Sequence, residues 1–531
     1  MAQDSILAVD VIKTPDSTVS VRVEDLLSTS EATIDKLTWT NDVGTSSSLL
    51  TFVNQRRDLV SHFGADPSGL TDSTAALQAA CEWVFGSTAG RRLDIPCGRY
   101  VLTSAITVDI AGGNGTIMGY GVGQASLRWT ADSDSQGFKF GVTTPMARLN
   151  MGNLQASTGY VSGDAFLEFH ANGGAVNSFR MFDMLVYGDG LLGTAANGYF
   201  GGGLVRAFNT NAPLLENLTF YSVDGSKENY LLTPTAIALT STTNATLFAR
   251  LVNCNVAHVG YAAYLKSSHV PGMEGIVIDG FNGMCAFGIK VDASASGNAG
   301  YYPPQCNITN SQIEYYASGL DINHVSVFQA EGLTLLQRPD STETATAIVM
   351  TDCRRSHVAN VYIEARPGTT GNGVWCNGAC DFVQINNLQA LINAGYTAII
   401  AGGASTNITY SNCSVVGGGG NLYANISTAP ATNDTASYNT TSECSTEIGN
   451  GIIVKAGSKT VTLGSGGSFS INWNSAFPNA CLTVVPVNGD VSALASSTIG
   501  VGTKNVTGFT GTVPGGSSGN SVRINYIAYG S

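Results

Sequence analysis

The stretch that decides the fold is NLTFY at residues 217–221, because its pattern recurs along the middle of the chain. Each recurrence begins with Asn or Gly, the residues that enter the left-handed backbone region at least cost. A tight corner before every strand explains that preference. Neighbouring segments start 22 to 36 residues apart, and the further seven are NCNVA (253–257), GIVID (275–279), NSQIE (310–314), GLTLL (332–336), NVYIE (360–364), NLQAL (387–391) and NCSVV (412–416).

The second and fourth positions of these segments are mostly apolar, with Ser311 and Ala390 as the exceptions. Alternation with period two places these positions on one face of a strand and the third and fifth positions on the other. Stacked coils would join the apolar faces into one core. The pattern therefore predicts an all-β chain with a right-handed parallel β-helix over residues 110–420. A sandwich of antiparallel strands does not need a left-handed corner at one fixed place.

A short amphipathic helix is expected before the repeats, in TDSTAALQAACEWV at 71–84. Asp72 or Ser73 can cap its first turn. The residues at i, i+3, i+4 and i+7 share one apolar face: Leu77, Ala80, Cys81 and Val84. Because the end of a β-helix exposes its core and its strand edges, we expect this helix to cover the first coil.

The segments FGADPSGLTDSTAALQAAC (63–81) and LDIPCGRYVLTS (93–104) resemble the start of the pectate-lyase-like superfamily. The resemblance rests on Phe63-Gly64-Ala65, Thr71-Asp72, Thr74 and Pro96-x-Gly98-x-Tyr100, whereas Pro67-Ser68-Gly69 departs from the usual Gly-Asp-Gly turn. Bacteriophage tailspikes and secreted polysaccharide-degrading enzymes share this start. The resemblance therefore implies the fold and leaves the chemistry open.

The C-terminal region resembles a small β domain of phage tail-fibre proteins. The resemblance is carried by AFPNACLTVVPV (476–487), NVTGFT (505–510) and INYIAYGS (524–531). In tail fibres this domain lies at the distal tip, assists trimer formation and can contact the host. From its own composition we expect a small β-sandwich of short strands.

The sequence thus predicts five segments. By analogy with tailspikes, residues 1–57 would attach the protein to the virion. The others are a capping helix with the start of the β-helix (58–109), the β-helix body (110–420), a linker rich in Gly, Ser, Thr and Asn (421–450) and a C-terminal β domain for trimerisation or receptor contact (451–531).

The composition argues against several classes of partner. A net charge of −13, with 25 scattered Lys and Arg, disfavours nucleic acid. The chain has no run of 18 apolar residues, so we expect no membrane insertion, and its N-terminus lacks the pattern of a secretory signal. The 11 cysteines lack zinc-finger spacing and are interpreted mainly as core hydrophobes. We expect no metal and no cofactor.

Three carboxylates occupy the fifth position of the repeats: Asp279, Glu314 and Glu364. With rungs about 4.8 Å apart, this alignment predicts that Asp279 and Glu314 lie about 5 Å from each other, and Glu314 and Glu364 about 10 Å. Glycosidases use two carboxyl groups, about 5–5.5 Å apart when retaining and about 6.5–9.5 Å apart when inverting. These residues are our catalytic candidates, and the rung arithmetic leaves the two mechanisms open.

The neighbouring positions supply candidates for binding a substrate, because amides hydrogen-bond to sugar hydroxyls and aromatic faces cover sugar rings: Asn255, Gln312, Tyr315, Tyr362 and Gln389. Several alternatives stay open. The outward carboxylates can be solvated or lie in a trimer interface, and Asp224, Asp321 and Asp352 are competing acids. Arg354, Arg355 and His324 can bind an acidic sugar or be ordinary surface groups. A calcium-dependent lyase would need an Asp cluster that we do not find in the sequence.

From the resemblance we expect a phage tailspike on the virion tail. It would be a homotrimer, joined through its N-terminus to tail or baseplate proteins. It would bind a polysaccharide of the host surface (capsule, O-antigen or exopolysaccharide) and hydrolyse it with paired carboxylates. A tail fibre or adhesin that binds without cleaving is one alternative, and a secreted pectinase-type lyase or hydrolase is another.

Overall fold

The computed structural model describes residues 38–40, 46–48 and 55–530, apart from 89, 111–112, 131–134, 145, 172–176, 189–197, 224–226, 243–247, 269–273, 295–303, 342–343, 366–369, 394–395, 417–420, 426–443, 448–452, 474–476, 478, 489–498 and 515–516. The predicted N-terminal attachment segment and linker therefore lie mostly outside the described residues. Before residue 55, the strands β1 (Thr38–Thr40) and β2 (Ser46–Ser48) pair antiparallel.

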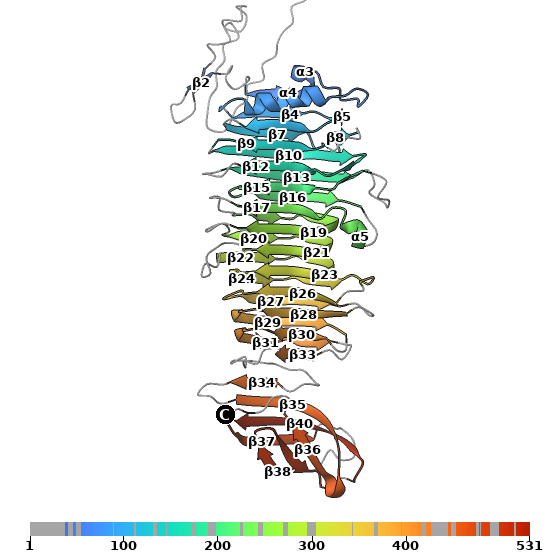
Figure 1. Cartoon of the computed structure of the whole chain (residues 1–531), viewed down its shortest axis with the longest axis vertical. Coiled ribbons are helices and arrows are strands. Elements are labelled where there is room, and N and C mark those ends of the chain that lie inside the picture. Colours follow the sequence, from blue (N-terminus) through green and yellow to red (C-terminus); the bar gives the residue numbers. More distant parts are fainter. Residues whose placement is uncertain are drawn as a thin grey trace, which may run out of the picture.

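Most of the described chain forms a parallel β-helix, as the repeats predicted, with coils stacked along one long axis (Figure 1). Each full coil contributes one strand to each of three parallel ladders, which we call sheets A, B and C in chain order. Sheet A contains β3 (Arg56–Asp58), β4 (Arg91–Ile95), β7 (Gly113–Gly119), β18 (Arg250–Val252), β20 (Ile276–Asp279), β22 (Pro304–Thr309), β24 (Ser326–Glu331) and β31 (Thr406–Ser411).

Sheet B contains β5 (Gly98–Leu102), β8 (Ala125–Trp129), β25 (Thr334–Gln337) and β32 (Ser414–Val416). Sheet C contains β6 (Ile106–Ile110), β9 (Phe138–Val142), β12 (Ala165–Ala171), β15 (Gly203–Phe208), β17 (Thr235–Ser241), β26 (Thr344–Thr351), β28 (Thr370–Asn377), β30 (Thr397–Ala401) and β33 (Asn421–Asn425). A smaller pair, β11 (Val161–Ser162) and β14 (Tyr199–Phe200), lies outside these ladders.

Longer strands bend around a corner and belong to two sheets. Sheets A and B share β10 (Ala147–Thr158), β13 (Ser178–Gly188), β16 (Leu214–Tyr221), β27 (His357–Glu364) and β29 (Asp381–Leu391). Sheets B and C share β19 (Asn255–Ser267), β21 (Asn282–Asp292) and β23 (Gln312–Asn323). Inside the coils a continuous apolar core runs from Leu59 to Cys413.

The corner between sheets A and B explains the repeated Asn or Gly. At this corner the backbone has φ between 49° and 66°, in the left-handed region that Asn and Gly tolerate: Asn217, Asn253, Gly280, Asn310, Gly332, Asn360, Asn387 and Asn412. Seven of the eight predicted segments start at this corner. The eighth, GIVID, was placed wrongly: Gly275 is also left-handed, but it precedes a strand of sheet A, and the corner residue of that coil is Gly280.

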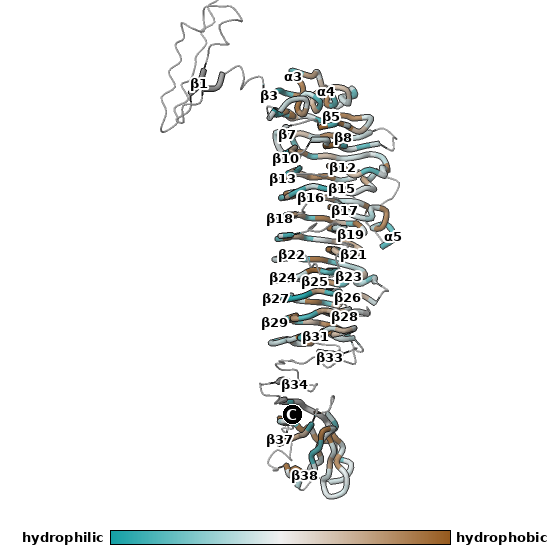
Figure 2. The backbone as a smooth tube through the Cα atoms, turned by 60° about the vertical axis from the view of Figure 1, so that its left-hand side comes forward, coloured by the Kyte–Doolittle hydropathy of each residue, from teal (hydrophilic) through white to brown (hydrophobic). Residues whose placement is uncertain are grey.

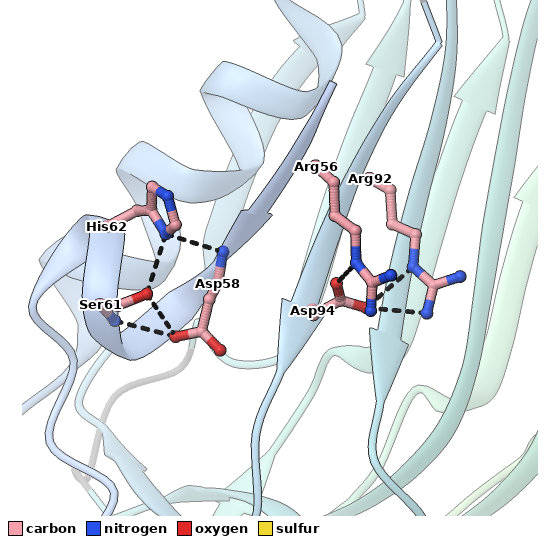
Figure 3. A network of polar contacts seen from close by, with 6 residues as sticks. All are labelled: Arg56, Asp58, Ser61, His62, Arg92 and Asp94. Carbon is pink, nitrogen blue, oxygen red and sulfur yellow. Dashed lines mark hydrogen bonds and ion pairs between the residues drawn. The ribbon is translucent and has the colours of Figure 1, made fainter. Parts of the chain in front are cut away.

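The predicted capping helix is confirmed. It is α4 (Thr74–Phe85), which begins after Ser73 and buries the expected face together with Phe85. A short helix, α3 (Leu59–Phe63), precedes it, and the Asp58 carboxylate accepts hydrogen bonds from the first backbone N–H groups of that helix. Figure 3 shows this cap beside a second network, in which Arg56 and Arg92 both pair with the buried Asp94. The contact of Arg56 with Asp94 joins β3 to β4.

The C-terminal region forms two antiparallel sheets around a separate core, in agreement with the predicted small β-sandwich. One sheet contains β34 (Cys444–Glu447), β35 (Ile453–Thr462), β37 (Cys481–Asn488) and β40 (Ser521–Gly530). The other contains β36 (Ser468–Asn472), β38 (Gly500–Asn505) and β39 (Gly508–Thr512), and the 3₁₀ turn η2 (Ser465–Gly467) precedes it.

Candidate functional site

The outer face of sheet B brings two of the predicted carboxylates into one column. Glu314 pairs with Leu336, and Leu336 pairs with Glu364, so the two glutamates lie two rungs apart as the sequence predicted. Two rungs correspond to about 10 Å along the sheet. Both glutamates are half-buried, and the side chain of Leu336 lies between them in the column.

A second outward column runs beside the first and carries mostly amides. Asn255 pairs with Asn282, and Asn282 pairs with Gln312. The column continues through Thr334 to Tyr362 and Gln389. Asn282 was missed because GIVID occupied its place in the predicted register. The alternating run that begins at Phe281 was the signal that could have identified it.

A pocket of about 310 Å³ lies over both columns. Its lining residues are Tyr221, Asn255, Ala257, His258, Asn282, Gly283, Met284, Gln312 and Glu314. Asn255 Nδ2 donates a hydrogen bond to Tyr221 Oη at 3.3 Å. On the side towards sheet C, the helical turn α5 (Lys227–Tyr230) projects from the stack (Figure 2). The ring of Tyr230 lies 5.4 Å from that of His258, so α5 lies beside one edge of the pocket.

Glu314 has a cationic neighbour that sequence reasoning missed. Arg338 Nη1 lies 3.5 Å from Glu314 Oε2, and Arg338 Nε lies 3.5 Å from Asp340 Oδ1. Tyr316 Oη donates to Asp340 Oδ2 at 2.7 Å, and burial together with this bond raises the pKa of Tyr316 to about 12. Arg338 follows β25 directly in the chain, so its place beside Glu314 depends on the turn after that strand.

Glu364 has a hydroxyl partner on its own strand. Tyr362 Oη donates to Glu364 Oε2 at 3.1 Å. Burial, together with the hydrogen bond to Glu364 and its charge, raises the pKa of Tyr362, so the phenol keeps the proton that it donates. Gln389 is exposed one coil further along.

Two predicted site residues do not belong to this face. Asp279 lies on sheet A, where it pairs with Val252 and Thr309, so its predicted position one rung from Glu314 was wrong. Hydrogen bonds from Thr309 Oγ1 at 2.6 Å and Asn310 Nδ2 at 2.9 Å lower the pKa of Asp279. Tyr315 is also excluded as a sugar platform, since it points into the core with 1% of its surface exposed.

The competing residues are dispersed. Asp321 lies on sheet C, with Oδ2 2.8 Å from Lys290 Nζ. Asp352 and His324 have positive φ at the corner between sheets C and A, where the Asp352 carboxylate accepts from the Ala379 N–H. Arg354 and Arg355 are exposed, and Asp224 lies outside the described residues.

A larger hollow of about 650 Å³ lies on sheet A and is lined by Arg250, Val252, Val277, Asp279, Thr309, Asn310, Glu331, Gly332 and Asn360. Its two carboxylates are already engaged at the corner. Asp279 accepts from Asn310, and Glu331 accepts from Asn360 Nδ2 at 3.2 Å. We place the candidate site on sheet B, because Asn255, Asn282 and Gln312 form a row there beside Glu314.

The described part of the chain contains no cluster of three or more His, Cys, Asp or Glu residues that could hold a metal ion. The described cysteines are free thiols, and all except Cys97 are buried, which agrees with their interpretation as core hydrophobes. None of the described helices has both the length and the apolar character needed to cross a membrane.

Fold and site define a class of protein. It is a parallel β-helix that has a polar surface on the outer face of sheet B and a separate antiparallel β domain at its C-terminus. We call this surface, formed by the two outward columns and the pocket over them, the groove. Residues 447–531 match the family of gp53-like tail fiber proteins, in their C-terminal domain. No curated protein sequence matches the chain.

Solved tailspikes share the fold of nearly the whole chain. A double mutant of the tailspike protein of E. coli bacteriophage HK620 aligns over 94% of this chain and 98% of its own, with 12% identity and a TM-score of 0.54. A single mutant of that tailspike, in complex with pentasaccharide, aligns over 94% and 98%, with 13% identity and a TM-score of 0.50. Tailspike protein gp49 of Pseudomonas phage LKA1 aligns over 89% and 99%, with 14% identity and a TM-score of 0.48. The chain therefore combines a β-helix body of the tailspike fold with a C-terminal domain of the tail-fibre type.

Proposed function

We propose that the chain is a phage tailspike that binds a polysaccharide of the host surface along the outer face of sheet B and hydrolyses it between Glu314 and Glu364. One observation carries the proposal. Three successive coils present Asn255, Asn282 and Gln312 in a row, and all three line the pocket that contains Glu314. The complex of a tailspike of similar fold with pentasaccharide supports the choice of ligand.

The chemistry of this face suits a polymer of sugars. Amide side chains both donate and accept hydrogen bonds, as sugar hydroxyls do. Because three successive coils present an amide at the same place, the column offers similar partners to successive sugar units of an extended chain. The open groove is therefore better matched to a polysaccharide than to a small, enclosed ligand.

We propose hydrolysis with inversion, because Asp279, the candidate one rung from Glu314, lies on another sheet. The remaining pair, Glu314 and Glu364, is about 10 Å apart at the backbone. Inverting enzymes hold their two carboxyl groups about 6.5–9.5 Å apart, and retaining enzymes hold theirs about 5–5.5 Å apart. We assign Glu314, which pairs with Arg338, as the base that activates water. We assign Glu364 as the acid that protonates the leaving oxygen, with one of its own oxygens oriented by Tyr362.

We further propose that the protein assembles as a homotrimer, with its N-terminal segment towards the phage tail and its C-terminal domain in contact with partner copies. The outer face of the C-terminal sheet supports this role. Leu482, Val485 and Ile527 are 55%, 53% and 44% exposed, and Val485 pairs directly with Ile527. An apolar face of this kind is stabilised when another chain covers it.

The test uses purified protein and purified bacterial capsular and O-chain polysaccharides, with wild type beside Glu314→Gln, Glu364→Gln and Glu82→Gln. Glu82 lies exposed on the capping helix, away from the groove. Its Gln variant therefore removes the same charge as the two groove variants without changing the groove. We expect new reducing ends without ultraviolet absorbance from unsaturated sugars. The rate should fall at least about 100-fold in each groove variant and stay at the wild-type level in the control.

Other outcomes separate the alternatives. Cleavage that survives both groove substitutions would place the catalytic residues elsewhere. Unsaturated products would identify a lyase. Binding of a polysaccharide without cleavage would leave a receptor-binding adhesin.

A further inference from the structure

The two outward columns of sheet B continue from the groove to the N-terminal end of the β-helix. The column of amides continues from Asn255, one residue per coil, through Thr219, Leu185, Gln155, Ser126 and Arg99. The column of Glu314 continues through Met284, Ala257, Tyr221, Tyr187, Ser157 and Arg128. One outer face therefore connects the groove to the first coils.

A second pocket, of about 410 Å³, lies over the N-terminal part of this face. We call it the N-terminal pocket, and its lining residues are Gly98, Arg99, Gly123, Gln124, Ser126, Gln155, Ser157 and Tyr187. Strands β8 and β10 supply the two serines and Gln155, whereas Gly123 and Gln124 belong to the turn that precedes β8. All of these residues are uncharged except Arg99, so the pocket combines polar groups with a single cation.

Two tyrosines connect the N-terminal pocket to the groove. Tyr187 lines the N-terminal pocket, Tyr221 lines the pocket of Glu314, and the two tyrosines pair on neighbouring coils. Tyr187 Oη accepts a hydrogen bond from Gln155 Nε2 on the preceding coil at 2.6 Å. Tyr221 Oη accepts one from Asn255 on the following coil. Because a phenol that accepts a hydrogen bond can still donate its own proton, each tyrosine offers a donor to a ligand on this face.

The cation of the N-terminal pocket is not neutralised within the described part of the chain. Arg99 is exposed, and no described carboxylate forms an ion pair with it. Along the two columns no carboxylate occurs before Glu314. The half-buried Arg128 adds a second cation beside Ser157. This end of the face is therefore positively charged.

Two acids lie near β5, and both already accept hydrogen bonds from other groups. Asp66 is followed by Pro67, whose carbonyl accepts from the Arg99 N–H. Asp72 pairs with Val101. The two carboxylates accept from the hydroxyl groups of neighbouring residues: Ser68, Thr71, Thr74 and Thr103. The Arg99 guanidinium is thus the charge that the N-terminal pocket presents to a ligand.

We propose that the N-terminal pocket binds an acidic sugar of the same polysaccharide, with the carboxylate of that sugar on Arg99. A guanidinium presents its N–H groups in a planar fork that matches the two oxygens of a carboxylate. The side chains of Ser126 and Gln155 offer hydrogen-bond partners to the sugar hydroxyls. The inference rests on the proposed function in taking a polysaccharide on sheet B as the ligand, and it narrows that ligand to polymers with carboxylated sugars.

The separation of the two pockets gives the inference a signature of its own. Arg99 and Gln312 lie in one column and seven rungs apart, which corresponds to about 34 Å along the sheet. A polysaccharide that spans this distance binds more tightly than one that fills the groove alone, because the second contact is intramolecular. A short oligosaccharide in the groove gains nothing from Arg99.

The test measures binding to an array of purified bacterial polysaccharides, some with carboxylated sugars and some without, by surface plasmon resonance. All proteins carry Glu364→Gln to prevent cleavage, and the reference protein is compared with its Arg99→Gln and Arg148→Gln variants. Arg148 is also exposed and forms no ion pair with a described residue, but it lies on sheet A, so its variant removes the same charge away from the groove. Each polysaccharide that binds is tested again after chemical reduction of its carboxyl groups, which keeps the linkages and removes the charge.

We expect Arg99→Gln to bind a carboxylated polysaccharide roughly tenfold more weakly than the reference protein, the ratio that corresponds to the loss of one charge-assisted hydrogen bond. Arg148→Gln should bind it like the reference protein. Reduction of the carboxyl groups should weaken binding to the reference protein by a similar ratio and leave binding to Arg99→Gln unchanged. Oligosaccharides too short to span the two pockets should bind both proteins equally, and thermal melting should show that both variants are folded.

The contrary outcomes are distinct. If Arg99→Gln binds a carboxylated polysaccharide as tightly as the reference protein, the acidic subsite is refuted while the groove remains. An equal loss in Arg148→Gln would show a general effect of charge and would also refute it. If the reference protein binds only polysaccharides without carboxylates, the inference fails and the proposed function stands. If it binds no polysaccharide on the array, both fail together.

Discussion

The corner residue Asn360 provides a direct test of why the coils turn where they do. Its backbone has φ of 54°. Its side chain accepts a hydrogen bond from Asn387 Nδ2 at 2.8 Å and donates one to Glu331 Oε1 at 3.2 Å. Asn360→Ala removes both hydrogen bonds. It also puts alanine in the left-handed region, where its side chain cannot form a local hydrogen bond that stabilises this conformation.

The expected loss is the sum of two contributions. Left-handed backbone costs an ordinary residue about 1–2 kcal/mol. Two solvent-exposed hydrogen bonds add about 0.5 kcal/mol each, the low end of the usual range. The free energy of unfolding should therefore fall by about 2–3 kcal/mol. Over a β-helix of roughly 360 residues, with about 2.1 cal/mol/K of unfolding entropy per residue, this is a decrease in Tm of about 3 °C.

Differential scanning calorimetry of matched variants separates the two contributions. Asn360→Gly keeps the backbone freedom and loses only the hydrogen bonds, so its Tm should lie between those of wild type and Asn360→Ala. Asn282→Ala is the control, because Asn282 is exposed on an extended strand. Its Tm should change by less than about 1 °C. Equal changes for Asn360→Ala and Asn282→Ala would refute the explanation of the corner.

Three further predictions follow from particular contacts. Asp94→Asn should lower the free energy of unfolding by about 1–3 kcal/mol. The loss is smaller than for a fully buried ion pair, because the arginine partners of Asp94 are 51% and 43% exposed. An unchanged midpoint of urea unfolding would contradict this prediction. Because hydrogen bonds depress the pKa of Asp279 in the folded state, its stabilising contribution is complete above the ordinary pKa of 3.8 and is lost on acidification below it. The Tm of Asp279→Asn should therefore fall less steeply than that of wild type in acid, and parallel curves would argue against this role. Tyr362→Phe should slow polysaccharide cleavage roughly tenfold through the lost hydrogen bond to Glu364, with polysaccharide affinity retained; an unchanged rate would exclude Tyr362 from orienting that acid.

The fold could be predicted from sequence because its two determinants are local. A left-handed corner requires Asn or Gly, and the following strand alternates with period two, so the repeat pattern by itself places Glu314 and Glu364 in one column. The predicted register was wrong at GIVID because Gly275 is also left-handed and is also followed by alternating residues. The spacings between segments already favoured Gly280, since a corner at Gly280 gives coils of more even length than one at Gly275.

The site was only partly predictable, for physical reasons that differ by residue. Tyr315 was misplaced although the alternation that places Glu314 outward already directs its neighbour inward. Arg338 could not be assigned, because its position depends on the turn after β25 and not on the repeat.

The most direct test of the account is a crystal structure of the Glu314→Gln variant with an oligosaccharide taken from the polysaccharide that the wild type cleaves or binds. We predict sugar rings along the outer face of sheet B, with hydroxyls hydrogen-bonded to Asn255, Asn282 and Gln312 and the scissile bond between residue 314 and Glu364. Sugar bound in the hollow of sheet A, with the sheet B pocket empty, would contradict the assignment of the groove and of its catalytic pair.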